Sequence, residues 1–440
     1  MESTDVLVLG GGAAGLACMA GLSEQREAML LEREDQVGGL LRVYPAGDYV
    51  FDTTVHVLFF RNPQLLEALL GLLPQGVHRF ERKNLIWQGG VTIPYPYQFN
   101  AHALPDKVRD ACIAGFLDKA AVKGDLDGDF RGWLLNQFGA GFYEHFFGPY
   151  NRKLYGVPPQ QLEAAPLLWL IPADNEAAIR EGATAPPQNP PVTHCFYPRG
   201  RRGIHSVAAA LQELAQGPIR CGREVVRIEP SRRCVTTADG HQVSYKRLVS
   251  SLPLPVLLGL IEGLPPALDS AIERLRAQSV TMLHIGARRS GPALAAHWTY
   301  FPDSELPFYR MTRLEQITPD MCPVGASALM LECPGSEEPD RQEVLAQLTR
   351  IGALCDPGDV EEYRTLLIPY AYVLFLKGFR EVVAAAMDYL DECGIQSTGR
   401  YGGWQYLNIE RTIESGLQVA GRLTPAGAEP SNALQQLGVR

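Results

Sequence analysis

The sequence predicts an α/β protein that combines a parallel sheet, an inserted, mainly helical region and an antiparallel sheet. Near the N-terminus, a buried-strand pattern leads through a glycine-rich turn into a helix of small residues. Between about residues 66 and 190, apolar residues recur at intervals of three and four, as they do on helices.

The composition is that of an ordinary soluble globular protein. The 440 residues are 46% hydrophobic and 20% charged, enough for two or three domains with sizeable cores. A formal net charge of -9 argues against nucleic acid or an anionic membrane as the main partner. The short basic stretch "RGRRG" at 199–203 does not alter this, and a loop beside a phosphate explains it equally well.

Cysteine usage and hydropathy indicate a cytoplasmic protein. The nine cysteines show no CxxC spacing, so we expect buried thiols in a reducing compartment, without a disulfide framework or a metal site. The N-terminus leads directly into a strand, which leaves no room for a signal peptide. No apolar run approaches the roughly 20 residues that span a bilayer.

The segment "DVLVLGGGAAGLACMAGL" is the most informative part of the chain. Gly10, Gly12 and Gly15 form a GxGxxG motif between the first strand and the first helix. Such glycines permit a tight turn and let the backbone approach a pyrophosphate at a helix N-terminus. A second strand ends at Glu32, where a carboxylate would accept hydrogen bonds from ribose hydroxyls. The order strand, motif, helix, strand and acid predicts a Rossmann-like dinucleotide site.

A second glycine pair, Gly38 and Gly39, is followed by Arg42. This arrangement resembles the extended FAD fingerprint of amine-oxidase and glutathione-reductase-like flavoproteins, although a β-turn with an exposed arginine remains the alternative. The middle strand pair, within "GREVVRIEP" and "KRLVSSLPLPVL", would place Val225 beside the adenine. The C-terminal "GRYGGWQYLNIERTIESGLQVAG" resembles the final motif of that fold, a helix whose N-terminus points at the flavin.

The predicted FAD-binding domain is therefore discontinuous. We expect its three parts at residues 1–65, 191–265 and 386–440, a helical inserted domain at 66–190 and a sheet-rich substrate domain at 266–385. Three aromatic islands break the apolar pattern, "VTIPYPYQFN", "FFGPYNRKLYGVPP" and "HWTYFPDSELPFYRMT". Aromatic faces beside Arg, Lys, Asn and Gln suit a nucleobase or sugar site, and ordinary strand and loop aromatics are the alternative.

Together with the fingerprint, "FDTTVHVLFF", "FYPRGRRGI" and "GRYGGWQY" make the chain resemble UDP-galactopyranose mutases, the eukaryotic-type branch more than the bacterial one. The resemblance runs in order over most of the chain. It implies ring contraction of a nucleoside-diphosphate sugar by reduced FAD, through a covalent adduct at flavin N5. The sequence leaves the electron donor open, with NADPH or NADH as the candidate reductants.

Position by position, the resemblance implies three sets of residues. The catalytic set is His56, Arg310 and Arg400. The cofactor-binding set is Gly10, Gly12, Ala14, Gly15, Glu32, Gly39, Arg42, His56, Val225, Gly399, Arg400 and Tyr406. The substrate-binding set is Tyr95, Gln98, Asn151, Tyr155, Trp298, Tyr300, Arg310, Tyr370 and Tyr406.

The sequence departs from the mutase pattern in two places. Leu170 stands near the position of a second diphosphate arginine on a mobile loop, and Thr54 and Val55 replace two glycines before His56. These departures favour an alternative function, an FAD-dependent oxidase, dehydrogenase or desaturase of the amine-oxidase type. A third hypothesis is a flavin-binding protein that has lost its chemistry. The sequence leaves the oligomeric state open.

Overall fold

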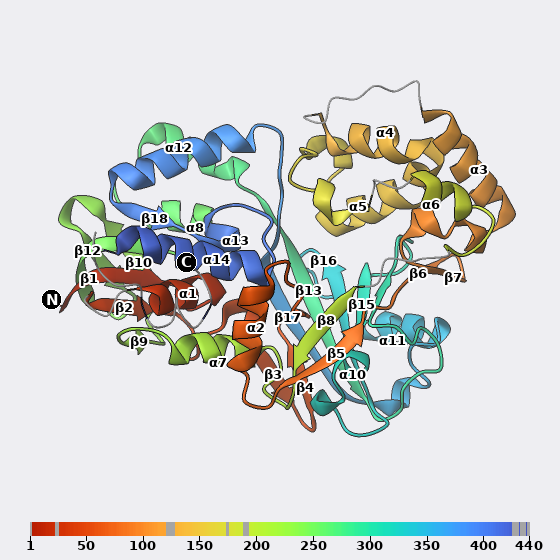
Figure 1. The fold of residues 1–440 in the computed structure, drawn as a ribbon, viewed down its shortest axis with the longest axis horizontal. Helices are drawn as coiled ribbons and strands as arrows, with labels where there is room; N and C mark the ends of the chain where they lie inside the picture. Colours follow the sequence, from red (N-terminus) through yellow and green to blue (C-terminus); the bar gives the residue numbers. More distant parts are fainter. Residues whose placement is uncertain are drawn as a thin grey trace.

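The computed structural model describes residues 2–22, 26–119, 128–172, 176–187 and 193–424, together with residues 431 and 437. Figure 1 shows a parallel sheet with its helices at one end, an antiparallel sheet in the middle, and a group of helices over the other end. The architecture confirms the predicted α/β class and its combination of two sheets with an inserted helical segment. The domain boundaries given above remain predictions.

Seven strands form the first sheet. They are β1 (Glu2–Leu9), β2 (Ala28–Leu31), β9 (Ile219–Arg220), β10 (Val225–Glu229), β11 (Cys234–Thr237), β12 (Gln242–Ser250) and β18 (Ile395–Ser397). The order is β10-β11-β12-β1-β2-β9, and β18 also pairs with β12. The pairs β1–β2, β1–β12, β2–β9 and β12–β18 are parallel, whereas β10, β11 and β12 form an antiparallel meander.

The carboxyl ends of four parallel strands meet at one edge of this sheet. Leu9 is in register with Leu31 and Ser250, and Ser250 is in register with Ser397. The segments that follow these strands therefore begin side by side, although they are separated by up to several hundred residues along the chain. In open parallel sheets this edge is where ligands bind.

Two helices from opposite ends of the chain pack closely beneath this edge. They are α1 (Ala13–Gly21) and α14 (Ile409–Leu423). A Cβ atom at Gly416 would lie 2.2 Å from the carbonyl oxygen of Ala14, so only glycine permits this approach. Helix α7 (His205–Glu213) packs on the other side of α1.

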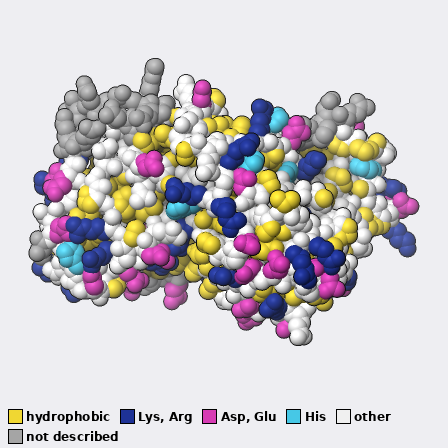
Figure 2. Space-filling model, turned by 90° about the horizontal axis from the view of Figure 1, so that it is seen from below, with side chains coloured by type: hydrophobic (Ala, Val, Ile, Leu, Met, Phe, Trp, Pro, Cys, Tyr) yellow, Lys and Arg dark blue, Asp and Glu magenta, His cyan; other side chains and the backbone are white. Residues whose placement is uncertain are grey.

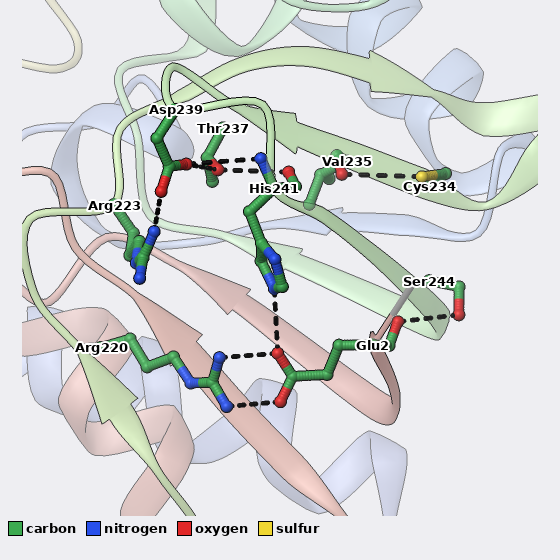
Figure 3. A network of polar contacts seen from close by, with 9 residues as sticks. All are labelled: Glu2, Arg220, Arg223, Cys234, Val235, Thr237, Asp239, His241 and Ser244. Carbon is green, nitrogen blue, oxygen red and sulfur yellow. Dashed lines mark hydrogen bonds and ion pairs between the residues drawn. The ribbon is translucent and has the colours of Figure 1, made fainter.

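Polar contacts around Glu2, the first residue of β1, connect this strand to β9 and β12 (Figure 3). Both oxygens of the Glu2 carboxylate accept hydrogen bonds from the Arg220 guanidinium, and Glu2 Oε2 lies 3.0 Å from His241 Nε2. Ser244 Oγ donates to the Glu2 carbonyl at 3.2 Å. These contacts help to hold three strands that are distant in sequence.

The helical segment contains α3 (Asp106–Leu117), α4 (Phe130–Phe142), a π-helical turn (Tyr143–Phe147), α5 (Gly148–Tyr155) and α6 (Glu176–Glu181). Gly139 interrupts α4 with φ 77°, and a Cβ atom there would lie 2.1 Å from the carbonyl oxygen of Gly115 in α3. Helices α3 and α4 therefore cross at a point where their backbones touch. A two-stranded sheet of β5 (Val77–Glu81) and β8 (His194–Pro198) lies where the chain enters and leaves this segment.

The second sheet has the order β17-β13-β16-β15-β14-β6-β7. Its strands are β6 (Asn84–Gln88), β7 (Val91–Pro94), β13 (Ala277–Ala287), β14 (Trp298–Tyr300), β15 (Arg310–Arg313), β16 (Ser327–Pro334) and β17 (Val360–Val373). All its pairs are antiparallel except β6–β14, which is parallel. The hairpin of β3 (Val43–Ala46) and β4 (Tyr49–Asp52) packs against this sheet through β16.

The other α-helices of the described chain are α2 (Pro63–Gly71), α8 (Leu254–Gly259), α9 (Pro266–Ala271), α10 (Leu314–Ile317), α11 (Arg341–Arg350), α12 (Phe379–Glu392) and α13 (Gly399–Gly402). Within the described ranges, none of the helices combines the length and the apolar composition that crossing a membrane requires. On the face seen from below in Figure 2, acidic and basic side chains are interspersed.

Candidate flavin and substrate site

Three glycines shape the turn between β1 and α1. Gly10 has φ 93°, which favours glycine. Gly15 packs so closely on the turn that a Cβ atom would lie 2.0 Å from the Gly10 carbonyl oxygen. At Gly12, the N-cap of α1, a Cβ atom would meet nothing within 4 Å. The turn is therefore tight on its inner side and open at the helix N-terminus, as pyrophosphate binding requires.

The second glycine pair lies against this turn. Gly38 N donates to the carbonyl oxygen of Gly11 at 2.8 Å. A Cβ atom at Gly39 would lie 3.2 Å from Gly12 Cα. The φ angles of Gly38 and Gly39 are 122° and 55°, in the region that favours glycine. The pair thus lies directly beside the open position at Gly12.

Glu32 and Arg42 lie beside the turn. The buried Glu32 carboxylate accepts from Gly11 N at 2.6 Å and from Glu34 N at 3.0 Å. Arg42 Nε donates to the Gly39 carbonyl at 3.2 Å, and Arg42 Nη1 lies 3.0 Å from Glu34 Oε2. Each charged group therefore stabilises the loop backbone, and the positive charge of Arg42 is shared with Glu34.

The C-terminal motif closes the same surface. Gly399 begins α13 with φ 83°, and a Cβ atom there would lie 2.7 Å from Ala14 Cβ. We call Gly10–Gly15, Gly38–Gly39 and Gly399 the glycine cradle. Val225 begins β10, the edge strand of the same sheet.

His56 lies four residues after β4, with its side chain half-buried. Its Nδ1 is 2.9 Å from the carbonyl oxygen of Thr54 and 3.0 Å from Thr54 Oγ1. Burial lowers the pKa of His56 to about 4, and the nearby charges of Arg400 and Arg310 act in the same direction. At neutral pH the ring is therefore uncharged. Because the carbonyl can only accept, Nδ1 carries the proton and Nε2 is left as an acceptor.

Thr54 and Val55 stand in the loop before His56 without positive φ angles. The Thr54 hydroxyl contacts the imidazole, so this residue holds the ring that a glycine would leave free. Val55 packs against two of the hydrophobic cores. The loop is consequently anchored at both residues.

Arg310 and Arg400 approach His56 from different elements. Arg310 begins β15, and its guanidinium bonds to Glu332 of β16 through Nε at 2.6 Å and Nη2 at 2.5 Å. Arg400, in α13, donates to the carbonyl oxygens of Leu407 at 3.0 Å and Ala371 at 3.4 Å. The tertiary structure thus brings the three predicted catalytic residues together.

Six tyrosines form a connected group beside these residues, which we call the tyrosine cluster. Its members are Tyr95, Tyr150, Tyr155, Tyr300, Tyr309 and Tyr372, with neighbouring ring centroids 5.4–6.5 Å apart. They come from the helical segment, the antiparallel sheet and the loop after β7. Most of the ring pairs are tilted or edge-to-face, the geometry that aromatic quadrupoles favour.

Tyr406 connects the cluster region to an exposed aromatic residue. Its ring lies 4.1 Å from the Arg400 guanidinium carbon and 5.4 Å from the Trp169 ring. Trp169 is 48% exposed. Leu170, next to it, packs against the largest hydrophobic core, so no cation replaces the missing arginine at that position.

Four of the predicted substrate residues make other contacts. Gln98 is buried and donates from Nε2 to the carbonyl oxygen of Pro172 at 2.7 Å. Asn151 is buried and donates to the Phe147 carbonyl within its own helix at 2.8 Å. Trp298 is buried in a hydrophobic core.

The fourth, Tyr370, packs against the edge of a core and, in the described chain, makes no ring contact with the tyrosine cluster. Tyr372, two residues further along β17, does belong to the cluster. The register between β17 and β13 is irregular along this part of the sheet.

Glu332 and Tyr372 lie outside the motifs from which the site was predicted. Glu332 is the one acid in the buried strand "SALMLECP" (β16), and a lone carboxylate in such a strand requires a partner. That signal was available in the sequence, but the identity of the partner was not, because it depends on strand register.

The parallel sheet and the glycine cradle define a dinucleotide-binding flavoprotein. The chain belongs to the family of flavin-containing amine oxidoreductases, whose model matches residues 13–424. The glycine cradle fits FAD, because the open backbone at Gly12 has room for the pyrophosphate. Among solved structures, reduced UDP-galactopyranose mutase has a similar fold, with a TM-score of 0.87 and 24% identity, covering 100% of this chain and 98% of the other.

Enzymes with other activities share the fold at lower similarity. A putrescine oxidase variant gives a TM-score of 0.65 at 13% identity, covering 96% of this chain and 99% of the other. A fatty acid isomerase from P. acnes gives 0.64 at 12% identity, covering 95% and 98%. Similarity at these identities shows the fold alone, so the function has to be argued from the site.

Proposed function

We propose that the chain is an FAD-dependent enzyme that isomerises the ring of a nucleotide-activated sugar, as UDP-galactopyranose mutase does. The observation that carries this proposal is the convergence of His56, Arg310 and Arg400 beside the tyrosine cluster. The similarity to the mutase over the whole chain supports it.

In this proposal the glycine cradle, Glu32 and Arg42 hold FAD, and Val225 lies at the adenine. Reduced flavin, once bound, supplies the electron pair that attacks the anomeric carbon of the sugar. NADPH or NADH would be the reductant. His56, uncharged and held by Thr54, presents Nε2 as a hydrogen-bond acceptor.

The protein residues position the substrate and its leaving group. Tyr95, Tyr300 and Tyr155 would contact the nucleoside and sugar, while Arg310 would stabilise the diphosphate as negative charge develops on it. Tyr406 covers Arg400, which restricts access of water to that guanidinium.

The test uses the purified protein with its flavin identified from the visible spectrum. After reduction with dithionite, UDP, GDP and dTDP sugars are titrated and the ring form of the sugar is followed by NMR. We expect pyranose and furanose forms to interconvert only with reduced flavin. Absence of binding and of isomerisation for every nucleotide sugar would exclude the proposal.

A second candidate function is oxidation or desaturation of another substrate by the same flavin. It is favoured by the pairing of Arg310 with Glu332 and by Leu170 in place of an arginine, which leave little free positive charge for a diphosphate. Sustained oxygen or dye reduction driven by an amine or alcohol would support this function over the mutase proposal.

A further inference from the structure

Glu332 is a buried carboxylate that the proposed reaction does not use. It is 3% exposed and lies in the middle of the site. Its Oε1 accepts from Arg310 Nε at 2.6 Å, and its Oε2 accepts from the hydroxyls of Tyr309 at 2.6 Å and Tyr372 at 3.2 Å. Both carboxylate oxygens are therefore saturated by groups of the site.

The pairing of Glu332 with Arg310 is fixed by the sheet. In the antiparallel register of β15 and β16, Arg310 stands directly opposite Glu332. The backbone repeats this alignment, because Tyr309 N donates to the Glu332 carbonyl at 2.9 Å. Because strand pairing places the two residues opposite each other, the Arg310–Glu332 ion pair forms when the sheet forms, before any ligand binds.

Arg310 keeps an accessible side. Its side chain is 24% exposed, whereas that of Glu332 is 3% exposed. Within the described part of the chain, its side-chain hydrogen bonds go to Glu332 and Tyr372. An anion that approaches from the accessible side would share the guanidinium with a carboxylate that is already bound to its other edge.

We propose that Glu332 is a positioning residue that aims Arg310 and competes with the phosphate groups of the substrate for its charge. The inference rests on the proposed function, since it assigns the anion to a nucleotide sugar. Glu332 neutralises the charge of Arg310 in the free enzyme, so Arg310 binds the diphosphate less tightly. Weaker binding lets the diphosphate leave the sugar and return to it more readily. A buried arginine left without its carboxylate would instead bind any phosphate that reaches it more tightly.

The test compares FAD-loaded wild-type protein with Glu332→Gln, which keeps the shape and removes the charge. The ligands are inorganic pyrophosphate, UDP-glucose and uridine, with Kd measured by calorimetry and melting temperature measured with and without each ligand. We expect Glu332→Gln to bind pyrophosphate and UDP-glucose at least about fivefold more tightly and uridine unchanged. Without ligand, its melting temperature should be lower than that of wild type. Pyrophosphate should raise its melting temperature by more than it raises that of wild type.

The matched control is Glu315→Gln. Glu315 forms another buried pair in the same region, with Arg313 at 3.2 Å, and its carboxylate also accepts from Ser327 and Ala328 N. This control should lower the melting temperature and leave both phosphate affinities unchanged. A purely structural role for Glu332 would make the two variants behave alike.

Unchanged or weaker pyrophosphate binding by Glu332→Gln would overturn the inference. If that variant loses FAD, Glu332→Asp is tested instead. It keeps the negative charge and moves the carboxylate away from Arg310 by the length of one methylene group. We expect about twofold tighter pyrophosphate binding from this partial release, and no tightening would also overturn the inference. If pyrophosphate binding tightens as expected but neither protein binds any of the UDP, GDP and dTDP sugars, the proposed function fails while the role of Glu332 stands.

Discussion

Burial shifts the pKa values of two titratable residues, Asp52 and His56, in opposite directions. Asp52 ends β4, is fully buried and accepts a hydrogen bond from the Tyr197 hydroxyl at 2.7 Å. Burial raises the pKa of Asp52 to about 7, whereas it lowers the pKa of His56 to about 4. In both cases the cause is the cost of placing a charge in a medium of low polarity. Asp52 therefore changes charge near neutral pH, whereas His56 stays uncharged there.

Replacing Asp52 by Asn should stabilise the protein in a pH-dependent way. Because the folded-state pKa of Asp52 is raised, its contribution to stability is present at pH 4 and lost as the pH rises through about 7. Asp52→Asn should therefore match wild type near pH 4 and exceed it at pH 8 by about 2–4 kcal/mol. Urea unfolding at both pH values measures this, with the exposed Asp269→Asn as control. Equal stabilisation at both pH values would contradict the explanation.

Arg310→Ala should weaken nucleotide-sugar binding without loss of FAD. The substitution removes the guanidinium, so we expect UDP-glucose affinity to fall about tenfold, equivalent to about 1.4 kcal/mol. It also leaves Glu332 buried without its ion-pair partner, so the melting temperature should fall. The visible spectrum and calorimetry measure the two effects separately. Loss of FAD from a folded variant would show that Arg310 belongs to the cofactor site.

At the scale of elements, close approaches between backbones position the cradle. Gly416 in α14 permits contact with the Ala14 carbonyl in α1, and Gly399 permits contact with the Ala14 side chain. Because α1 begins in the cradle, any displacement of α14 moves the turn that faces the cofactor. Packing of two distant helices thus determines the geometry of the dinucleotide site.

Two glycines of α14 should respond oppositely to alanine. Gly416→Ala places a methyl group 2.2 Å from the Ala14 carbonyl oxygen, and overpacking of this kind costs about 1–3 kcal/mol. Gly421→Ala meets nothing within 4 Å and should stabilise the helix by about 0.5–1 kcal/mol. Thermal unfolding and FAD content of the two variants test this difference. Similar behaviour would show that the α1–α14 contact does not control the cradle.

Gly12→Ala should separate folding from cofactor binding. A Cβ atom at Gly12 meets no protein atom within 4 Å, so the FAD-free variant should be as stable as wild type. The same methyl group would occupy the space that the pyrophosphate needs, and we expect FAD affinity to fall at least about tenfold. Fluorescence titration of the FAD-free protein provides the measurement. Normal FAD affinity would place the pyrophosphate elsewhere.

At the scale of the whole molecule, the site is assembled from parts of the chain that are far apart in sequence. The cradle joins segments near residues 10, 38 and 399, and the tyrosine cluster joins the helical segment to the antiparallel sheet (Figure 1). A ligand bound across such segments stabilises all of them at once, because unfolding any one segment releases it.

FAD should therefore raise the melting temperature of the entire chain. With free FAD at 100 times its Kd, binding adds about 2.7 kcal/mol to the free energy of unfolding. We expect circular dichroism and flavin fluorescence to report one shared transition in the holoprotein, a few degrees above that of the FAD-free protein. Release of FAD well before the loss of secondary structure would indicate that the cofactor contacts only one segment.

The sequence by itself determined the dinucleotide site and the class of fold. Gly10, Gly12, Gly15 and Glu32 act through local backbone geometry, which a motif of fixed spacing encodes. The mainly helical segment followed from the periodicity of its apolar residues. The helical periodicity and the Gly10–Gly15 turn depend on residues close in the chain, and Glu32 follows at a fixed spacing within the same strand-helix-strand unit.

Only the tertiary structure decided which polar side chains face one another. Gln98 and Asn151 lie in the predicted islands but bond to backbone carbonyls, and Tyr372 rather than Tyr370 joins the cluster. Glu332 meets Arg310 because β15 and β16 pair in one register. Register and packing depend on contacts across the whole chain, and a shift by one residue would turn each side chain to the opposite face. Motifs and residue spacing therefore could not predict how much positive charge the site offers to a substrate.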